Sequence, residues 1–235
     1  MSQVLSRIRN RVTRQLLGGV AKSALRERLT YLSPRKLWRL ERALASVVRA
    51  NIAGDLVEFG TALGGSGLVI ASRAAGRNFH GFDVFSMIPP PNSPKDDQKS
   101  KQRYEDIKSG ASAGLGGDVY YGYRPDLYAE VKATFARYGT PVDGARVRLH
   151  QGLFEETWPA AAIDRIALAH VDCDWYDPVA FVLGAIADRM SPGGLIIIDD
   201  YNDYGGCRTA VDEFIAKRDD FVFSPGLNPI LRKRA

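Results

Sequence analysis

The sequence lacks the features that mark disulfide-stabilised, membrane-spanning and secreted proteins. It has only two cysteines in 235 residues, Cys173 and Cys207, too few for a disulfide framework. No apolar run approaches the roughly 18 residues that a membrane-spanning helix needs. No apolar block typical of a secretory signal stands near the N-terminus. These absences lead us to expect a cytoplasmic protein with free thiols.

Acidic residues are scarce in the first part of the chain. Residues 1–50 contain 12 Lys/Arg and 2 Glu, whereas residues 51–235 carry a net charge of −5. We therefore predict a basic, helical N-terminal arm over 1–50, bent at Gly18-Gly19, and a catalytic domain over 51–235. This uneven distribution argues against a nucleic-acid partner, despite the isoelectric point of 9.2. We expect the arm to self-associate or to contact an anionic membrane surface.

Apolar segments that alternate with helical patterns indicate the fold. Such an alternation is typical of an α/β protein with a doubly wound, mostly parallel sheet and helices on both faces. Residues 86–118 are rich in Pro, Ser, Gly, Lys and Asp, and we expect a long, partly mobile loop there, within a lid at about 86–125. The predicted strands are 55–59, 79–83, 146–150, 166–172 and 195–199, the predicted helices are 34–48, 126–138, 178–190 and 207–217, and 221–223 with 229–231 form a terminal hairpin.

A glycine-rich turn follows the first predicted strand, in the sequence VEFGTALGGSG of residues 57–67. The dinucleotide pattern fails because Ala62 stands where its second glycine belongs, and the phosphate-loop pattern fails because no Lys follows. An acidic residue, Glu58, followed by Gly60 and Gly64 suits a cationic nucleoside without phosphate, such as S-adenosylmethionine. The alternative is a tight turn that binds no ligand. Asp83 ends the second strand, where an acid accepts hydrogen bonds from ribose hydroxyls or merely caps a turn.

Acidic residues also stand at the ends of two later strands. Asp172 and Asp174 close the fourth strand, and Asp199 and Asp200 close the fifth. Neighbouring parallel strands end at one edge of a sheet, so three of these carboxylates would converge and repel one another without a cation. Oxygen ligands suit Mg²⁺, or else Mn²⁺ or Ca²⁺, and no His/Cys set accompanies them to favour zinc. The alternative is a group of solvated strand-end acids.

These motifs resemble the macrocin O-methyltransferase family, metal-dependent sugar O-methyltransferases of antibiotic biosynthesis with mycinamicin and novobiocin relatives. The resemblance covers most of residues 54–217. The matching segments are Gly54–Glu58 with Gly64-Gly65, Asp83–Phe85 with Pro89, Gly152–Phe154 with Thr157 and Pro159, Asp172–Tyr176, Ser191–Gly194 through Asp199–Tyr201, and Gly206-Cys207 with Ala210-Val211 and Phe214. The last three of these segments, in this order, are the most specific.

The resemblance implies a class I S-adenosylmethionine-dependent methyltransferase fold and a set of site residues. Metal ligands fall on Asp172, Asp199 and Asp200, the catalytic base on Asp172, and ribose binding on Asp83. The sequence departs from the family at Ser86–Pro91 and in the long segment 92–125, so a macrolide or coumarin acceptor is not implied. The residues assigned to the cofactor are Glu58, Gly60, Thr61, Gly64, Ser66, Asp83, Gln151 and Gly152.

The chemistry expected of such a site is methyl transfer from S-adenosylmethionine to a hydroxyl of a sugar or glycosylated small molecule. A divalent cation lowers the pKa of a hydroxyl that it coordinates, and Asp172 would then accept the proton. Two alternatives stay open. One is a methyltransferase for another small-molecule hydroxyl, such as a catechol. The other is a non-catalytic nucleoside-binding or membrane-surface module, against which the three strand-end acids argue.

Overall fold

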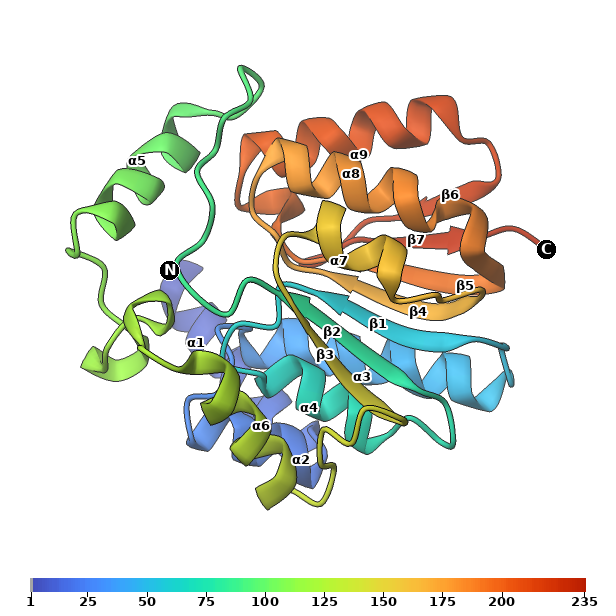
Figure 1. Ribbon diagram of the computed structural model, residues 1–235, viewed down its shortest axis with the longest axis horizontal. Coiled ribbons are helices and arrows are strands. Elements are labelled where there is room, and N and C mark those ends of the chain that lie inside the picture. Colours follow the sequence, from blue (N-terminus) through green and yellow to red (C-terminus); the bar gives the residue numbers. More distant parts are fainter. Residues whose placement is uncertain (1) are drawn as a thin grey trace.

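A single seven-stranded sheet forms the centre of the molecule (Figure 1). The computed structural model describes residues 2–235, with side chains from residue 8 onward, so the first residue of the predicted arm and the side chains of residues 2–7 lie outside what it describes. Five strands are parallel and a C-terminal antiparallel pair completes the sheet. In spatial order the strands are β3 (Val147–Gln151), β2 (Phe79–Asp83), β1 (Asp55–Phe59), β4 (Ile166–Val171), β5 (Met190–Ile198), β7 (Ile230–Lys233) and β6 (Phe221–Ser224).

Helices cover both faces of the sheet, as the sequence predicts. One face carries the helices that contribute to the first apolar core, and the opposite face carries those of the second core. On the first face lie α2 (Gly19–Arg26), α3 (Pro34–Arg49), α4 (Gly65–Ser72) and α6 (Leu127–Arg137), and on the second lie α7 (Phe154–Ala160), α8 (Tyr176–Ile186) and α9 (Gly205–Lys217). Within the described residues, no helix is both long enough and apolar enough to span a membrane.

The strand order places the carboxyl ends of β1, β4 and β5 next to one another. All six residues of β4 are buried, because this central strand is covered on both faces. The register pairs Phe59 with Val171 and Val171 with Ile198. The residues that follow these positions therefore meet at one edge of the sheet. From β1 the strand order runs outward to β2 and β3 on one side and to β4 and β5 on the other. Ligands bind at such a switch point, here between β1 and β4, in open α/β sheets.

The N-terminal helices lie on the first face of the sheet. The helix α1 (Ser2–Leu16) ends before Gly18, so the predicted break at Gly18-Gly19 is present. Pro34 begins α3 and the Ser33 hydroxyl accepts a hydrogen bond from the Lys36 N–H at 3.3 Å, which caps the helix. Residues 37–47 of α3 bury apolar side chains in the core beside β4 and β5. The boundary between arm and catalytic domain at residue 50 stays a prediction. The helix α3, which lies before that boundary, belongs to the packed core.

The segment 86–125 contains regular structure, which corrects the expectation of a loop. It forms α5 (Gln98–Lys108) and short 3-10 turns at Leu115–Gly117 and Tyr121–Tyr123. The helix stands away from the sheet in Figure 1. The Asp97 carboxylate accepts hydrogen bonds from the Ser100 N–H and from the Gly205 N–H, each at 2.8 Å. One side chain thus caps α5 and ties it to the start of α9. The composition of the segment did not reveal this helix, because Lys, Ser and Asp also suit an exposed helix that buries only two side chains, Ser100 and Ile107.

Candidate active site

The glycine-rich turn after β1 closely approaches the end of β4. Gly60 has a φ of 91°, and a Cβ there would lie 1.8 Å from the carbonyl oxygen of Asp172. Gly64 has a φ of 84° directly before α4. Both conformations favour glycine, and at Gly60 any side chain would collide with backbone. The turn can therefore bring backbone N–H groups and the start of α4 close to a ligand.

Asp83 braces this turn from the end of β2. Its carboxylate accepts hydrogen bonds from the Ala62 N–H at 2.8 Å and from the Phe85 N–H at 2.6 Å. Burial raises its pKa to about 6, against the lowering effect of these backbone donors and with a further rise from the charge of Glu58. Asp83 lines the cavity described below, so lone pairs of its oxygens remain available to a ligand.

Glu58 points away from that cavity, into the core. Its side chain is fully buried, and Oε1 lies 2.9 Å from Nδ1 of the fully buried His170 on β4. Burial lowers the pKa of His170, but the hydrogen bond and charge of Glu58 outweigh it and raise that pKa overall. A Cβ at Gly67 would lie 2.5 Å from Glu58 Oε2, so the carboxylate sits directly beneath α4. Glu58 thus links β1 to β4 beneath α4 through its contact with His170.

The remaining residues assigned to the cofactor surround the turn without lining the cavity. Thr61 and Ser66 are buried in the turn and the first turn of α4. Gln151 ends β3 beside Asp83, and the Gly152 N–H donates to the Asp83 carbonyl at 3.0 Å. Among the predicted cofactor residues, Gly60 and Asp83 are the two that border the cavity directly.

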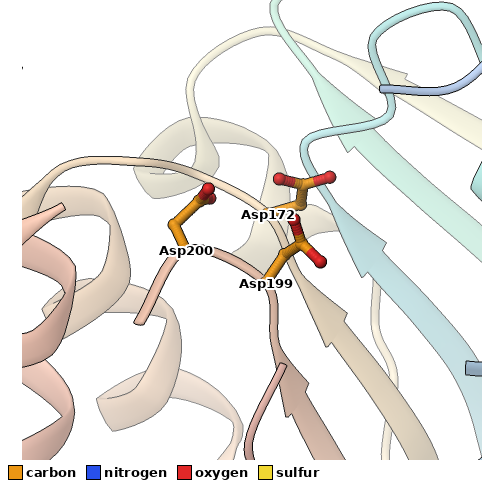
Figure 2. Close-up of side chains that lie close together, drawn as sticks. All are labelled: Asp172, Asp199 and Asp200. Atoms are coloured by element: carbon orange, nitrogen blue, oxygen red, sulfur yellow. The ribbon is translucent and has the colours of Figure 1, made fainter. Parts of the chain in front are cut away.

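Three carboxylates converge next to the turn (Figure 2). Asp172 follows β4, Asp199 follows β5, and Asp200 begins the next short turn; one carboxylate oxygen from each lies within 4.8 Å of the others. The backbone sets this arrangement, because the Asp172 N–H donates to the Phe59 carbonyl and the Asp199 N–H donates to the Val171 carbonyl, each at 2.9 Å. The sheet register therefore holds the three acids side by side.

The electrostatics of this cluster suit a bound cation. Burial, together with the charges of its acidic neighbours, raises the pKa of Asp172 and of Asp200 well above the usual range. Oδ1 of Asp199 is buried and has no hydrogen-bond partner among the described residues. A divalent cation held by oxygen ligands would offset the repulsion and supply that missing partner.

Lys36 of α3 reaches the same cluster, which the sequence did not predict. Its ammonium group donates to Asp199 Oδ2 at 2.8 Å, to the Asp199 carbonyl at 3.0 Å and to Asp203 Oδ2 at 2.7 Å. The charges of these acids outweigh the effect of burial and raise its pKa. Lys36 lies more than 160 residues before its partners, so no local pattern could reveal the contact.

A cavity of about 590 Å³ opens above the turn and the acids. The lid supplies much of its wall, and the Trp175 indole N–H donates to the Pro89 carbonyl at 2.9 Å, which joins the lid to the loop after β4. Asp174 also borders this space, and burial raises its pKa to about 7. Wall residues that sequence reasoning missed include Tyr31, Lys36, Pro90, Lys99, Arg103, Tyr120, Tyr121 and Tyr204.

A doubly wound sheet, a glycine turn after β1, an acid after β2 and a cavity at the switch point define the class: class I S-adenosylmethionine-dependent methyltransferases. The chain belongs to the macrocin O-methyltransferase family, whose sequence profile matches residues 21–113 and 125–221. It is therefore an enzyme, an S-adenosylmethionine-dependent O-methyltransferase.

Characterised relatives come from antibiotic-producing bacteria. The chain is 30% identical over 193 residues to mycinamicin III 3''-O-methyltransferase of Micromonospora griseorubida, covering 79% of this chain and 69% of that protein. It is 28% identical over 198 residues to demethyldecarbamoylnovobiocin O-methyltransferase of Streptomyces niveus, covering 81% and 69%. The solved structure of the O-methyltransferase NovP superposes with a TM-score of 0.70 at 25% identity, covering 88% of this chain and 82% of that one.

Proposed function

We propose that this enzyme methylates a hydroxyl group of a sugar or of a glycosylated small molecule, with a divalent cation, Mg²⁺, held by Asp172, Asp199 and Asp200. The observation that carries the proposal is the convergence of these three carboxylates within 4.8 Å, two of them buried and Asp172 half-buried, beside the glycine turn in one cavity. The acceptor class follows from the relatives, one of which methylates the 3'' position of mycinamicin III according to its name.

The methyl donor is expected to lie against the turn after β1. Asp83 is positioned to accept hydrogen bonds from ribose hydroxyls, and Gly60 lets the backbone approach the donor closely. Gln151 and Gly152 remain candidates for the base of the nucleoside, because they stand beside Asp83. We assign Glu58, Thr61, Gly64 and Ser66 the task of shaping the turn.

Proton transfer is assigned to Asp172. A sugar hydroxyl is a weak nucleophile, and when bound the cation supplies positive charge that favours loss of its proton. Asp172 stands beside the glycine turn and the other two acids, so its carboxylate is placed to accept a proton from an acceptor hydroxyl in the cavity. As the acceptor oxygen bonds to the methyl carbon, the methyl–sulfur bond breaks, the proton passes to Asp172 and S-adenosylhomocysteine leaves.

Aromatic and cationic residues of the lid would position the acceptor and exclude water. Tyr120 and Tyr121 lie with their rings 4.4 Å apart, and the Arg103 guanidinium lies 5.4 Å from the Tyr120 ring centre. Such a wall suits the apolar faces and the hydroxyl groups of a sugar ring. The Asp97 carboxylate ties the start of the lid helix to α9 and so holds this wall beside the cavity.

Removal of the metal tests the proposal directly. Methyl transfer from labelled S-adenosylmethionine should cease with excess EDTA and return with Mg²⁺. The acceptors to screen are free sugars, nucleotide sugars, glycolipids and catechols.

In calorimetry, Asp199→Asn should abolish Mg²⁺ binding, because it removes one ligand charge from the cluster. Asp177→Asn, an exposed acid at the cavity rim, is the matched control and should bind Mg²⁺ normally. Full activity in EDTA would exclude the metal role.

A further inference from the structure

The first helix, α1, exposes a row of large apolar side chains to solvent. Ile8, Val12 and Leu16 are 54%, 55% and 62% exposed, and their spacing of four residues puts them on one face of the helix. The opposite face holds the helix in place: Asn10 and Thr13 are half-buried, and Leu17 is buried in the core. The apolar row is therefore left without a partner among the described residues, although the helix itself is docked on α3.

Arginines flank this apolar row. Arg9 and Arg11 lie on either side of it and Arg14 lies further round the helix; all three are exposed. None of them forms an ion pair with a described residue. The whole of α1 contains four arginines and no acidic residue. An apolar face bordered by cations is typical of helices that lie in the interface of an anionic bilayer, with the apolar side chains among the acyl chains and the cations at the lipid phosphates.

Catalysis does not account for this helix. The match to the family begins at residue 21, after α1 has ended. No described residue of α1 borders the cavity. A second copy of the chain is a poorer partner than a membrane, because a symmetric contact would bring two α1 helices of the same strong positive charge together.

We propose that α1 docks this enzyme on the surface of an anionic membrane, with Ile8, Val12 and Leu16 inserted at the interface and Arg9 and Arg11 at the headgroups. In Figure 1, α1 and the lid helix α5 lie on the same side of the molecule as the carboxyl edge of the sheet. Docking through α1 would hold the cavity near the membrane surface. The proposal concerns binding and is independent of which acceptor the enzyme methylates.

The test is co-sedimentation of the full-length protein with extruded vesicles. Vesicles of equal parts phosphatidylcholine and phosphatidylglycerol should bind the protein, vesicles of pure phosphatidylcholine should not, and high salt should weaken binding. The double variant Ile8→Asp/Val12→Asp should lose binding because it removes the apolar row. Arg9→Glu/Arg11→Glu should weaken the partition coefficient at least about tenfold. All variants should keep the thermal midpoint and S-adenosylhomocysteine affinity of the parent, because the altered side chains are exposed.

A matched control separates this local effect from net charge. Arg146→Glu/Lys217→Glu changes the total charge equally at exposed residues outside α1 and should bind vesicles like the parent. The proposal is overturned if the parent protein ignores the anionic vesicles, or if Ile8→Asp/Val12→Asp binds them unchanged. It is also overturned if sedimentation shows a dimer that the same apolar variant dissociates while vesicle binding is absent, because α1 would then contact a second copy.

Discussion

Asp83 combines two tasks, because its buried carboxylate braces the glycine turn and also borders the cavity. Asp83→Ala removes the acceptor of the Ala62 and Phe85 N–H groups as well as the proposed ribose contact. We expect S-adenosylhomocysteine to bind roughly tenfold to a hundredfold more weakly, about 1.5–3 kcal/mol, by calorimetry. Asp83→Asn keeps the shape of the side chain and one acceptor oxygen, so its affinity for S-adenosylhomocysteine should fall less. Unchanged affinity in Asp83→Ala would remove Asp83 from the cofactor site.

Glu58 should matter to stability more than to ligand contact. Glu58→Ala leaves His170 buried without its charged partner, and removal of one member of a buried pair costs about 3–5 kcal/mol. Urea unfolding should show this loss, whereas Glu58→Gln, which keeps an acceptor for His170, should be less destabilised. If Glu58→Ala unfolds like the parent but no longer binds S-adenosylhomocysteine, Glu58 contacts the cofactor directly.

At the scale of elements, the lid depends on a few anchoring hydrogen bonds. Asp97→Ala removes both the cap of α5 and the tie to the Gly205 N–H. Loss of the cap alone costs about 1 kcal/mol. We expect faster proteolysis between residues 92 and 125 and a higher KM for the acceptor. Asp106→Ala, a change on the exposed face of the same helix, serves as the control and should affect neither readout. A lid that stays protected in Asp97→Ala would show that other contacts hold it.

The strands and the acids at their ends were predictable because both signals are local. A buried parallel strand is a continuous apolar run, and an acid that directly follows it must lie at the carboxyl edge of the sheet. The doubly wound sheet is confirmed, and so are the predicted strands, except that β5 begins at Met190 and not at residue 195. The inward orientation of the Glu58 side chain was not predictable. Side chains alternate between the two faces of a strand, but both faces of this strand are buried, so the alternation does not show which face holds a partner such as His170.

Most of the features that the sequence did not predict depend on contacts between distant segments. Lys36 reaches Asp199 across 163 residues, and its place in the basic N-terminal segment gave no sign of this contact. The helix α5 has a polar composition and buries only Ser100 and Ile107, so its periodicity is weak. The short helix α7 was missed because it contains Pro159 and spans only seven residues. Each of these features is decided by tertiary packing.

At the scale of the whole molecule, ionisable groups are gathered at both edges of the sheet. The carboxyl edge carries the acidic site. A second cavity, of about 560 Å³, lies toward the amino ends of β1 and β2 and is lined by Asp55, His80, Arg148 and His150. The rings of the two histidines are stacked, with His80 Nδ1 3.0 Å from His150 Nε2, and His80 Nε2 lies 3.4 Å from Asp55 Oδ2. A proton on His150 would lie beside the Arg148 guanidinium and the adjacent His80 ring, so this edge should respond to acid.

The stability of the whole fold should therefore fall in mildly acidic solution because of His150. Burial, followed by the positive charges of His80 and Arg148, lowers its pKa from 6.5 to about 4. The unfolded chain thus binds the proton more readily, so the stability that His150 contributes is complete above pH 6.5 and is lost as the pH falls toward 4. His150→Phe keeps the stacking on Phe82, whose ring centre lies 4.3 Å away, and removes the titration. In urea unfolding between about pH 7 and about pH 5, the parent should lose on the order of 1 kcal/mol more than the variant, after allowance for partial solvent exposure. Equal losses in both proteins would show that the histidine pair does not set the acid sensitivity of the fold.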